Sequence, residues 1–590
     1  MVATMLRLNK SVRLVQKTRK NRVACSGAIA SFSSTKVSNA DPSNPNESNI
    51  VSSPFPPIGT PSHSAFTEFV TEDWDQKRLK QVAILDGTTG QYRTFHEYKS
   101  DMTSIAASLK HDMDVDAKTI VALFSPNHVD YVPICLATAM TGGKLTPINP
   151  MYTEMELSTI LNHSGTKVLI AHASVMDVAL KALKSCPEVK HVVTIPDANE
   201  EIVGGSVPEG TTNLCELKLH STPMQETVGE VNLDTPYLIP YSSGTTGLPK
   251  GVCLSHGNLI SNLLQLDIAE GSGLLPEHKL ISPLPFFHIY GFLVSAVYCA
   301  WRGQEILTTS GRFDLENFCS LVEEHKPDRA HLVPPIVIGL AKHPVVENFD
   351  LKSIKMILSA AAPMGSSTEQ ELKDRLGCQV KQAWGMSELS PVGTLSPDDN
   401  VKSGSVGPLV SSTFAKILCL DTGKNLGPGE SGELLIKGPQ VMIGYLGDPD
   451  KTSECLCDDG WLRTGDIAYY DEDGYFYITD RLKELIKVRG YQVAPAELEA
   501  LLLTNEKIKD AAVIPVKDEA SGELPRAYIV PKDDGKVGKD AEKEIQDWVK
   551  ERVAPFKKLA GGVVFVDAIP KSASGKLLRR VLRDQAETSG

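Results

Sequence analysis

The chain has 590 residues, of which 41% are hydrophobic and 23% are charged. This composition is typical of a globular protein that buries several cores, and the length predicts about four domain-sized units. The net charge of −13 argues against a nucleic acid or an anionic membrane as partner. No apolar run reaches the roughly 20 residues that a bilayer-spanning helix needs, so no transmembrane segment is expected.

The eleven cysteines are scattered, with no C-x-x-C spacing, and Cys455 and Cys457 form the only close pair. This distribution argues against a disulfide framework and against a structural zinc site. It favours a reducing compartment.

Residues 1–40 differ from the acidic remainder of the chain, because they contain eight Lys or Arg and no Asp or Glu. Their basic residues are interleaved with Leu and Val and precede a Ser/Ala-rich stretch, without the apolar h-region of a secretory signal. Such a start is typical of an organelle transit peptide, so we expect mitochondrial import. A cytoplasmic protein with a disordered basic tail is the alternative. The C-terminus carries no peroxisomal tripeptide.

A fusion of residues 1–40 to a fluorescent reporter tests this expectation. Because the segment has the composition of an import signal, the fusion should accumulate in mitochondria. A matched fusion in which glutamine replaces the basic residues should stay diffuse. Diffuse fluorescence from both fusions would favour the tail that targets nothing.

Strands and helices are expected to alternate after residues 41–64, a Pro/Ser/Asn-rich interval that we interpret as a linker. A hairpin is predicted over Val82–Phe95, around the turn residues Asp86–Gly90. Strand-like and helical segments then alternate as Thr119–Ser125, Val129–Met140, Lys144–Ile148, Met155–Leu161, Lys167–Ala171, Val178–Leu183 and His191–Ile195. This alternation predicts a parallel sheet with crossover helices.

The same alternation returns further along the chain. Its segments are Asn258–Leu266, Lys279–Leu284, Gly291–Trp301, Glu305–Thr308, Leu315–Glu324, Arg329–Val333, Ile336–Lys342 and Ser353–Ser359. Two parallel sheets on successive chain segments are more plausible than one very wide sheet.

From about Ser403 the pattern becomes β-rich. Strands are predicted at Phe414–Leu420, Gly432–Lys437 and a hairpin over Asp466–Ile478, with no helical pattern between them. Beyond Asp480 a compact unit follows, with helices Ala496–Leu503 and Glu542–Val553 and strands Ala511–Val516, Arg526–Val530 and Val563–Phe565. We therefore expect an α/β fold: two parallel-sheet α/β subdomains plus a β-subdomain over residues 65–480, and a small α+β domain over residues 481–590.

The segment Tyr241–Val252 combines hydroxyls, glycines and a lysine between two apolar runs. Glycine lets backbone N–H groups converge on an anion, and the hydroxyls and ammonium add donors, which suits a polyphosphate. The residues that would bind ATP are Ser242, Ser243, Gly244, Thr245, Thr246, Gly247 and Lys250. A P-loop kinase or ATPase is disfavoured, because Pro249 and Gly251 flank the lysine where a hydroxyl must follow it. A Ser/Gly linker is the bland alternative.

Three further segments carry residue types that suit a nucleotide. Gln382–Glu388 offers an indole for a purine, a hydroxyl for a phosphate and a carboxylate for Mg²⁺. Asp466, at the end of Trp461–Asp466, can accept two hydrogen bonds from a cis-diol. Lys576, in Pro570–Lys576, can stabilise the negative charge that gathers when a carboxylate attacks an α-phosphate. Each residue alone would be read as ordinary surface or packing.

Together and in this order, the segments resemble the adenylate-forming superfamily of acyl-CoA synthetases, luciferases and peptide-synthetase adenylation domains, most closely the 4-coumarate–CoA ligases. The resemblance runs from about Phe66 to Arg583 and implies catalytic roles for Thr246, His288 and Lys576 and Mg²⁺ binding by Glu388. It implies that the following residues bind ATP beside the loop: Gln382, Ala383, Trp384, Gly385, Met386, Ser387, Asp466, Arg481, Lys487, Gln492 and Lys576. It implies that coenzyme A is bound by Arg489, Gly490 and Tyr491.

The resemblance also implies an acyl pocket, in part from the segment Pro285–Tyr290. The pocket residues would be His288, Tyr290, Leu358, Ala360, Ala361, Gly385, Pro391 and Val392. Coumarate ligases carry a polar or basic residue at the position of Leu358, near the phenol end. A leucine cannot hydrogen-bond a phenol, so this chain departs from the pattern where hydroxycinnamates are recognised.

What the resemblance implies is an ATP-dependent acyl-CoA ligase that converts a small carboxylic acid, ATP and CoA into acyl-CoA, AMP and diphosphate through an acyl-adenylate. The acid would be of the phenylpropanoid type or a fatty acid. In this family the small domain rotates about Asp480–Arg481 between the two half-reactions. A luciferase-like enzyme, or one that adenylates acids for a carrier protein, would share the motifs. A catalytically dead scaffold is disfavoured, because Lys250, Glu388, Asp466 and Lys576 are all present.

Overall fold

The computed structural model describes residues 49–197, 207–227, 231–242, 249–271, 277–362, 364–489, 491–518, 521–532, 540–572 and 576–588. The predicted transit peptide, most of the glycine-rich loop (Ser243–Gly247) and Gly490 lie outside these ranges. Residues 49–590 group as one compact unit. Within the described ranges, no helix combines the length and apolarity that crossing a membrane requires. The cysteines in these ranges are all free.

The first sheet has the strand order β10-β11-β9-β5-β4-β6-β7-β8, with β20 paired to β11. Its strands are β4 (Ile120–Phe124), β5 (Lys144–Ile148), β6 (Val168–His172), β7 (His191–Ile195), β8 (Thr212–Asn213), β9 (Pro236–Leu238), β10 (Tyr241–Ser242), β11 (Lys250–Ser255) and β20 (Gly444–Tyr445). Neighbouring strands among β9, β5, β4, β6, β7 and β8 run parallel, as predicted, whereas β10 and β11 are antiparallel to their neighbours.

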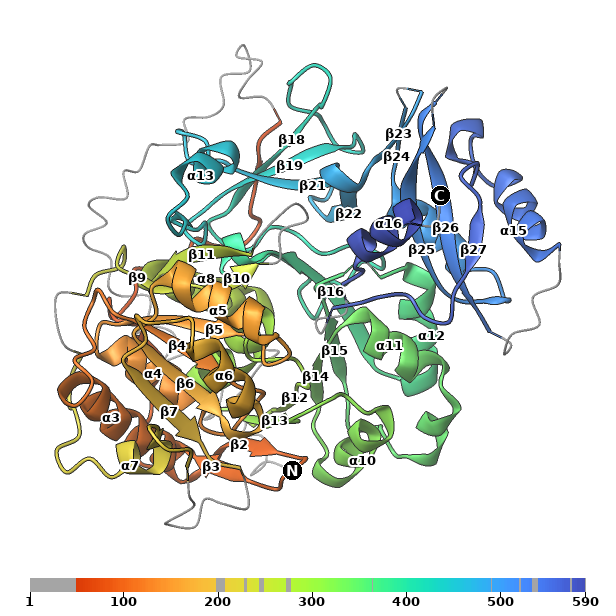
Figure 1. Ribbon diagram of the computed structural model, residues 1–590. Coiled ribbons are helices and arrows are strands. Elements are labelled where there is room, and N and C mark those ends of the chain that lie inside the picture. The colour runs from red at the N-terminus through yellow and green to blue at the C-terminus, as the bar shows by residue number, and fades with distance from the viewer. Residues whose placement is uncertain are drawn as a thin grey trace, which may run out of the picture. The chain divides into compact units, whose positions relative to one another are not determined.

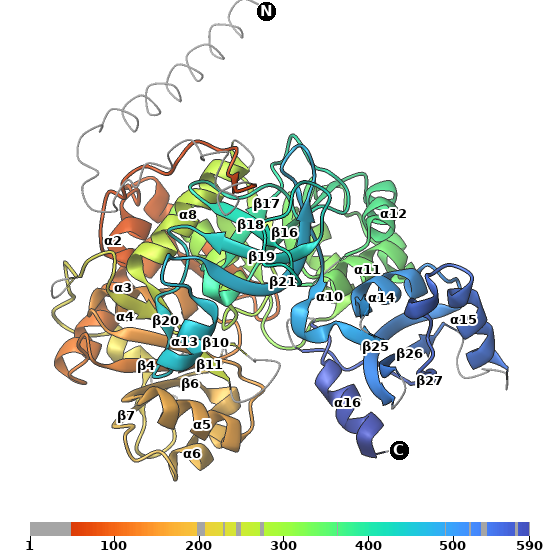
Figure 2. The ribbon, with the colours of Figure 1, turned by 90° about the horizontal axis from the view of Figure 1, so that it is seen from above.

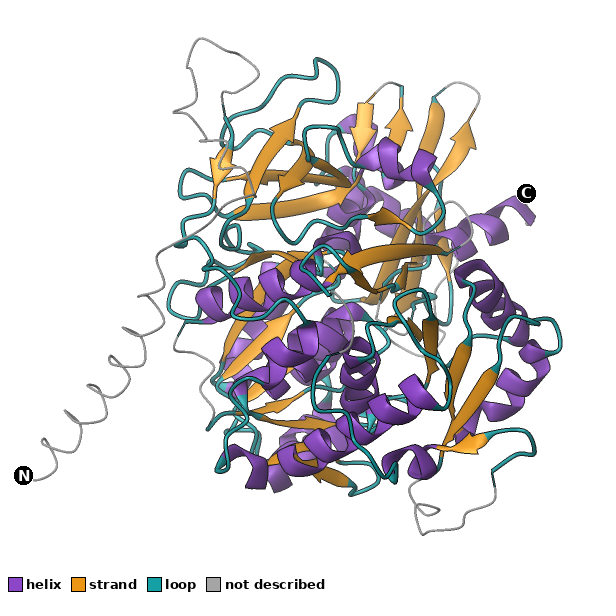
Figure 3. Cartoon of the chain, turned by 90° about the vertical axis from the view of Figure 1, so that its left-hand side faces the viewer, coloured by secondary structure: helices purple, strands orange, loops and turns teal. Residues whose placement is uncertain are grey.

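Helices cover both faces of this sheet (Figures 1 and 3). They are α2 (Phe66–Thr71), α3 (Phe95–His111), α4 (Tyr131–Met140), α5 (Glu154–Ser164), α6 (Met176–Leu183), α7 (Leu214–Lys218) and α8 (His256–Glu270). All five residues of β4 are buried: Val121 and Leu123 pack in the cluster that contains α3 and α4, and Ala122 and Phe124 pack with α5 and α6. A strand buried on both faces reads as a continuous apolar run, as the sequence does here.

The second sheet has the order β17-β16-β15-β14-β12-β13-β2-β3. Its strands are β2 (Val82–Asp86), β3 (Tyr92–Thr94), β12 (Lys279–Ile281), β13 (Glu305–Thr308), β14 (Arg329–Leu332), β15 (Met356–Ser359), β16 (Gln379–Gly385) and β17 (Val392–Leu395), and its helices include α10 (Leu315–His325), α11 (Pro334–Lys342) and α12 (Ser366–Leu376). The predicted hairpin β2–β3 is confirmed. The expectation of two separate sheets is confirmed, but their segments are not strictly successive. Strand β2 crosses to this sheet and pairs in parallel with β13, where it buries Ala83 and Ile84.

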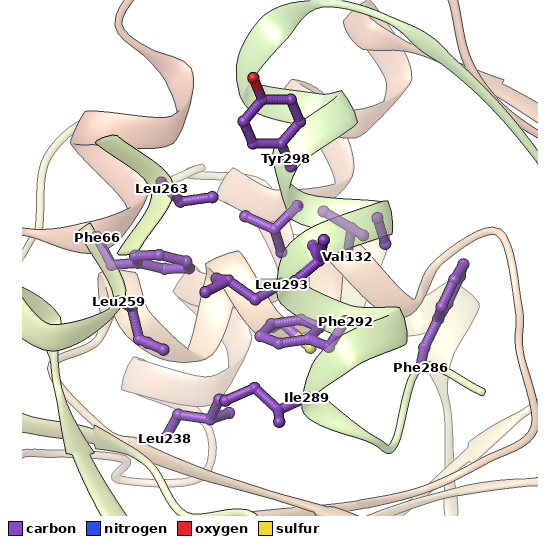
Figure 4. Packing of buried hydrophobic residues seen from close by; sticks show 14 of the residues in the cluster. Phe66, Val132, Leu238, Leu259, Leu263, Phe286, Ile289, Phe292, Leu293 and Tyr298 are labelled. Carbon is purple, nitrogen blue, oxygen red and sulfur yellow. The ribbon is translucent and has the colours of Figure 1, made fainter. Parts of the chain in front are cut away.

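An apolar helical segment fills the space between the α-helices of the first subdomain (Figure 4). It consists of the π-helical η3 (Tyr290–Val297) and α9 (Tyr298–Arg302). Phe292 and Leu293 lie among Phe66, Val132 and Leu259, which come from α2, α4 and α8. Every residue of η3 is buried, because a helix that is apolar all round needs partners on all sides.

The β-subdomain is an antiparallel sheet with the order β1-β18-β19-β21-β22. Its strands are β1 (Val51–Ser52), β18 (Phe414–Leu418), β19 (Gly432–Lys437), β21 (Leu462–Tyr470) and β22 (Phe476–Arg481). Two expectations fail here. The interval interpreted as a linker contributes β1, fixed by the hydrogen bond from Ser53 N to Thr413 O at 3.0 Å. A helix, α13 (Pro449–Cys455), lies between the strands, with Asp448 as its N-cap and proline in its first turn.

The small domain is a mixed sheet of order β24-β23-β26-β25, with β27 beside β26. Its elements are β23 (Ile486–Val488), β24 (Tyr491–Val493), β25 (Ile508–Asp518), β26 (Gly522–Pro531), β27 (Val563–Phe565), α14 (Pro495–Leu503), α15 (Ala541–Lys550) and α16 (Arg579–Thr588). Helices α14 and α15 pack in one cluster and α16 in another, so both faces are covered (Figure 2). The predicted α/β architecture with a small α+β domain is thus confirmed.

Candidate functional site

A cavity of about 410 Å³ is lined by the first sheet, the β-subdomain and the small domain. This volume is in the range of small-molecule sites. Predicted residues in its lining are Ser242, Lys250, His288, Met386, Ser387, Glu388, Asp466, Arg481 and Lys576. Residues from six segments, far apart in the chain, therefore meet around one space.

A buried carboxylate marks one part of this cavity. Asp466, on β21, is 5% exposed. The Nε of Arg481, directly after Asp480, lies 3.3 Å from its Oδ1. The indole N–H of Trp384 donates to its Oδ2 at 2.8 Å. Trp384 does not line this cavity but a second, smaller one, and the stacking of its indole on a purine stays a prediction.

Lys250 and Glu388 are linked by Tyr445, a residue that was not predicted to belong to the site. The Nζ of Lys250 lies over the Tyr445 ring, 4.6 Å from its centroid. The Tyr445 hydroxyl donates to Oε1 of Glu388 at 2.8 Å. Burial and the Glu388 carboxylate raise the pKa of Tyr445, so this hydroxyl stays a donor. Cation and carboxylate are held near each other without direct pairing.

Lys576 reaches the cavity from the small domain. Its backbone N–H donates to Ser572 Oγ at 3.1 Å, which fixes the end of its loop. Burial and the positive charge of Arg481 lower the pKa of Lys576 to about 8, while Glu388 and Asp466 act in the opposite direction. Burial and the charge of Lys576 lower the pKa of His288 to about 3, so the imidazole is neutral near pH 7. Lys576 is therefore a cation that lacks a tight anionic partner among the described residues, which suits the binding of a charged substrate.

The lowered pKa of Lys576 predicts proton uptake on ATP binding. At a pH slightly above 8, part of the free protein holds a neutral Lys576. Added phosphate charge favours the ammonium form, so the pKa rises and a proton is taken up. Calorimetry in buffers of different ionisation enthalpy measures this uptake. It should vanish well below that pH, where the lysine is charged in both states, and in Lys576→Ala. Uptake that survives in Lys576→Ala would contradict the assignment.

A second cavity, of about 40 Å³, adjoins the first. This volume has room for roughly three water molecules. All eight residues predicted for the acyl pocket line it: His288, Tyr290, Leu358, Ala360, Ala361, Gly385, Pro391 and Val392. Leu266, Val294 and Leu395, which sequence reasoning missed, complete the apolar wall. Ala360 and Ala361 follow β15 and Gly385 ends β16, so the pocket lies at the carboxyl ends of parallel strands, the usual binding edge of such sheets.

The polar side chains of the small cavity are already engaged or lie at its mouth. The Tyr290 hydroxyl donates to the carbonyl of Leu358 at 3.2 Å. The Trp384 N–H is bonded to Asp466. The remaining polar side chains, His288, Ser387 and Lys576, also line the large cavity. Among the described residues, the deep part of the pocket therefore offers no unengaged polar side chain.

Five residues line both cavities: His288, Ile289, Met386, Ser387 and Lys576. They mark the junction at which a molecule in the small cavity would meet one in the large cavity. An ammonium, a hydroxyl and a neutral imidazole converge there, and these groups suit the stabilisation of negative charge.

Several predicted residues lie away from the two cavities. Gln382 is buried in β16 and donates to Met364 O and Glu369 Oε2, both at 3.3 Å. Lys487, Arg489 and Gln492 belong to the β23–β24 hairpin or its turn and line neither cavity. Tyr491, 58% exposed, stacks on Phe556 with 4.6 Å between ring centroids. The small domain thus presents Lys576, and not this hairpin, to the large cavity.

Other lining residues of the large cavity were not predicted as site residues, although Arg463 lies in the predicted segment Trp461–Asp466. Glu433 is buried on β19 and pairs with Arg463 of β21. Tyr445, Cys455, Arg463 and Glu433 come from the β-subdomain or its connections. Tyr445 reaches the site through the pairing of β20 with β11, which links residues far apart in the chain.

Comparison with known proteins gives two sequence-family matches. The model of the AMP-binding enzyme family matches residues 71–446, and that of the AMP-binding enzyme C-terminal domain matches residues 497–576. The chain is 39% identical over 515 residues to "Probable 4-coumarate–CoA ligase 3" of Dictyostelium discoideum, covering 85% of this chain and 92% of that protein. It is 36% identical over 552 residues to "4-coumarate–CoA ligase 1" of Arabidopsis thaliana, covering 92% and 96%.

Solved structures agree with the fold. ATP-bound MatB from Rhodopseudomonas palustris matches with a TM-score of 0.78 and 27% identity over 89% of this chain and 99% of that chain. The anthranilate CoA ligase AuaEII with anthranoyl-AMP matches with a TM-score of 0.81 at 23% identity over 90% and 98%. At that identity the second match supports the fold alone.

Proposed function

The chain belongs to the AMP-binding enzyme family, a family of acid–thiol ligases, and on this premise we propose that it is an ATP-dependent acyl-CoA ligase. It converts a carboxylic acid, ATP and coenzyme A into an acyl-CoA, AMP and diphosphate. The observation that carries the proposal is the junction of the two cavities, where Lys576 lies beside His288 and Ser387. A nucleotide in the large cavity and an acid in the small one meet there.

In the first half-reaction, an oxygen of the carboxylate attacks the α-phosphorus of ATP, an acyl-adenylate forms and diphosphate leaves. Negative charge grows on the α-phosphate oxygens, and the ammonium of Lys576 stabilises it. Asp466 holds the ribose hydroxyls, and Lys250, which follows the glycine-rich loop in the sequence, binds the departing diphosphate. The neutral His288 borders the carboxylate and orients it without adding charge.

Glu388 is suited to hold a magnesium ion. It is a single carboxylate, with one oxygen bonded to Tyr445, and no cluster of three metal-binding side chains exists among the described residues. Mg²⁺ keeps several waters and is bound by one or two carboxylates plus substrate phosphates, so one carboxylate fits. When bound, the ion neutralises phosphate charge. Tyr445 orients the carboxylate and keeps it from pairing with Lys250.

In the second half-reaction, the thiol of coenzyme A attacks the carbonyl carbon, and AMP leaves. Lys487, Arg489, Tyr491 and Gln492 lie outside the large cavity, while Lys576 lines it. Rotation of the small domain about Asp480–Arg481 would withdraw Lys576 and bring Lys487, Arg489, Tyr491 and Gln492 to the adenylate. One cavity then serves both steps with different faces of one domain.

The engaged polar groups of the small cavity favour an acid without a polar far end, such as an unsubstituted cinnamate or a fatty acid. The protein is proposed to act in mitochondria, because residues 1–40 have the composition of a transit peptide.

Diphosphate release from ATP tests the proposal. Release should require an added carboxylic acid, and coenzyme A should be consumed in equal amount. A panel of cinnamates and of fatty acids from hexanoic to palmitic acid identifies the substrate. ATP cleavage that no acid stimulates would contradict the proposal.

A further inference from the structure

Trp384 lines the small cavity and is linked to the large cavity through a hydrogen bond to one of its lining residues. It is on β16, is 8% exposed, and lines the small cavity next to Leu358 and Ala383. Its Nε1–H donates to Oδ2 of Asp466, a residue of the large cavity, at 2.8 Å. One side chain thus forms a wall of the acyl pocket and a hydrogen bond to the carboxylate assigned to the ribose.

We propose that Trp384 is a positioning residue that orients Asp466 for the ribose hydroxyls, so that nucleotide selection depends on a side chain of the acyl pocket. This inference deepens the proposed function and rests on it.

The carboxylate of Asp466 accepts a hydrogen bond from Trp384 on Oδ2 and forms an ion pair with Arg481 at Oδ1. Arg481 Nε is 3.3 Å from Oδ1, but this side chain is 47% exposed and follows directly on the hinge residue Asp480. Trp384 comes from a strand inside the large domain and is buried. A carboxylate accepts about four hydrogen bonds, so two acceptor positions stay available for a cis-diol. The indole has a donor and no acceptor, so it can orient the carboxylate but cannot draw the ribose hydroxyl protons away from it.

The indole itself is held in place by close packing. A Cβ added to Gly393 would lie 2.6 Å from Cζ3 of Trp384, so glycine at this position leaves the room that the ring occupies. Trp384 is paired with Thr394 across the β16–β17 ladder. The donor atom is therefore fixed by the sheet and by a neighbour without a side chain.

Discrimination between ATP and 2′-deoxy-ATP tests the proposal, measured as the ratio of kcat/KM for acid-dependent diphosphate release. Trp384→Phe keeps an aromatic wall and removes the donor. The loss of a hydrogen bond to a charged group predicts that the preference for ATP falls about tenfold. Gly393→Ala, which displaces the ring and keeps its N–H, should lower the preference in the same direction.

Two further variants make the result specific. Asp466→Asn measures how much of the preference for ATP depends on the carboxylate. In the double variant, the addition of Trp384→Phe to Asp466→Asn should change this preference little. Trp301→Phe, at another buried tryptophan, is the matched control and should keep the preference of the wild type.

A wild-type preference in both Trp384→Phe and Gly393→Ala, together with its loss in Asp466→Asn, would overturn the inference and leave the proposed function intact. An unchanged preference in Asp466→Asn would overturn the ribose assignment as well. A wild-type protein that shows no acid-dependent diphosphate release would overturn the proposed function itself.

Discussion

Replacement of Lys576 by alanine should abolish acid-dependent diphosphate release while the protein still converts a supplied acyl-adenylate to the thioester. The reason is the position of Lys576 at the junction of the two cavities, from which rotation of the small domain would withdraw it before the thiol attacks. The loss of one electrostatic group at a transition state costs about a hundredfold to a thousandfold in rate, so the adenylation rate should fall by that factor. Single-turnover assays of each half-reaction measure it.

Lys571→Ala is the matched control, because this lysine lies in the same loop but outside both cavities, with its Nζ 2.5 Å from Asp510. It should leave both half-reactions close to the wild-type rates. Equal loss of both half-reactions in Lys576→Ala would show that the lysine is not specific to adenylation.

The acyl pocket should favour unsubstituted cinnamate or a fatty acid over 4-coumarate. Each buried CH₂ contributes about 0.8 kcal/mol, so kcat/KM should rise with chain length until the pocket is full. A phenol hydroxyl that faces Leu358 loses water without gaining a partner, which costs about 1–3 kcal/mol, or roughly tenfold in kcat/KM. The Tyr290 hydroxyl gives no help, because it is bonded to the Leu358 carbonyl.

Leu358→Lys should narrow or reverse this order, because it brings a donor to the phenol end. Leu358→Met, which conserves volume and polarity, should keep the wild-type order. A wild-type kcat/KM that is higher for 4-coumarate than for cinnamate and every fatty acid tested would contradict this account of the pocket.

The order of strands and helices could be predicted because local apolar patterns determine it. The β4, β5 and β6 segments read as short apolar runs and are buried on both faces. The crossing of β2 to the second sheet could not be predicted, because it depends on contacts between Ile84 and Ile306 that no local pattern records. Helix α13 was missed since its seven residues are mostly polar and it buries none of them.

The candidate site could be predicted because its residues lie in short segments that each resemble a motif of the adenylate-forming superfamily at several positions. Lys576, Asp466 and the eight acyl-pocket residues belong to such segments, and the structure brings them together around two adjoining cavities. Tyr445 could not be found in this way, because its contacts with Lys250 and Glu388 bridge three distant segments. The orientation of the Trp384 indole could not be predicted from the sequence either, because the same side chain could face a purine or a carboxylate.

Transfer of oxygen from the acid to AMP is the most direct test of the central claim, that the reaction passes through an acyl-adenylate. If the carboxylate attacks the α-phosphorus and the thiol then attacks the carbonyl carbon, a substrate labelled with ¹⁸O in both carboxyl oxygens leaves one label in AMP and one in the thioester. Mass spectrometry of the products should find both. Label in inorganic phosphate, with ADP as the nucleotide product, or AMP without label, would show that no acyl-adenylate is formed and would contradict the account.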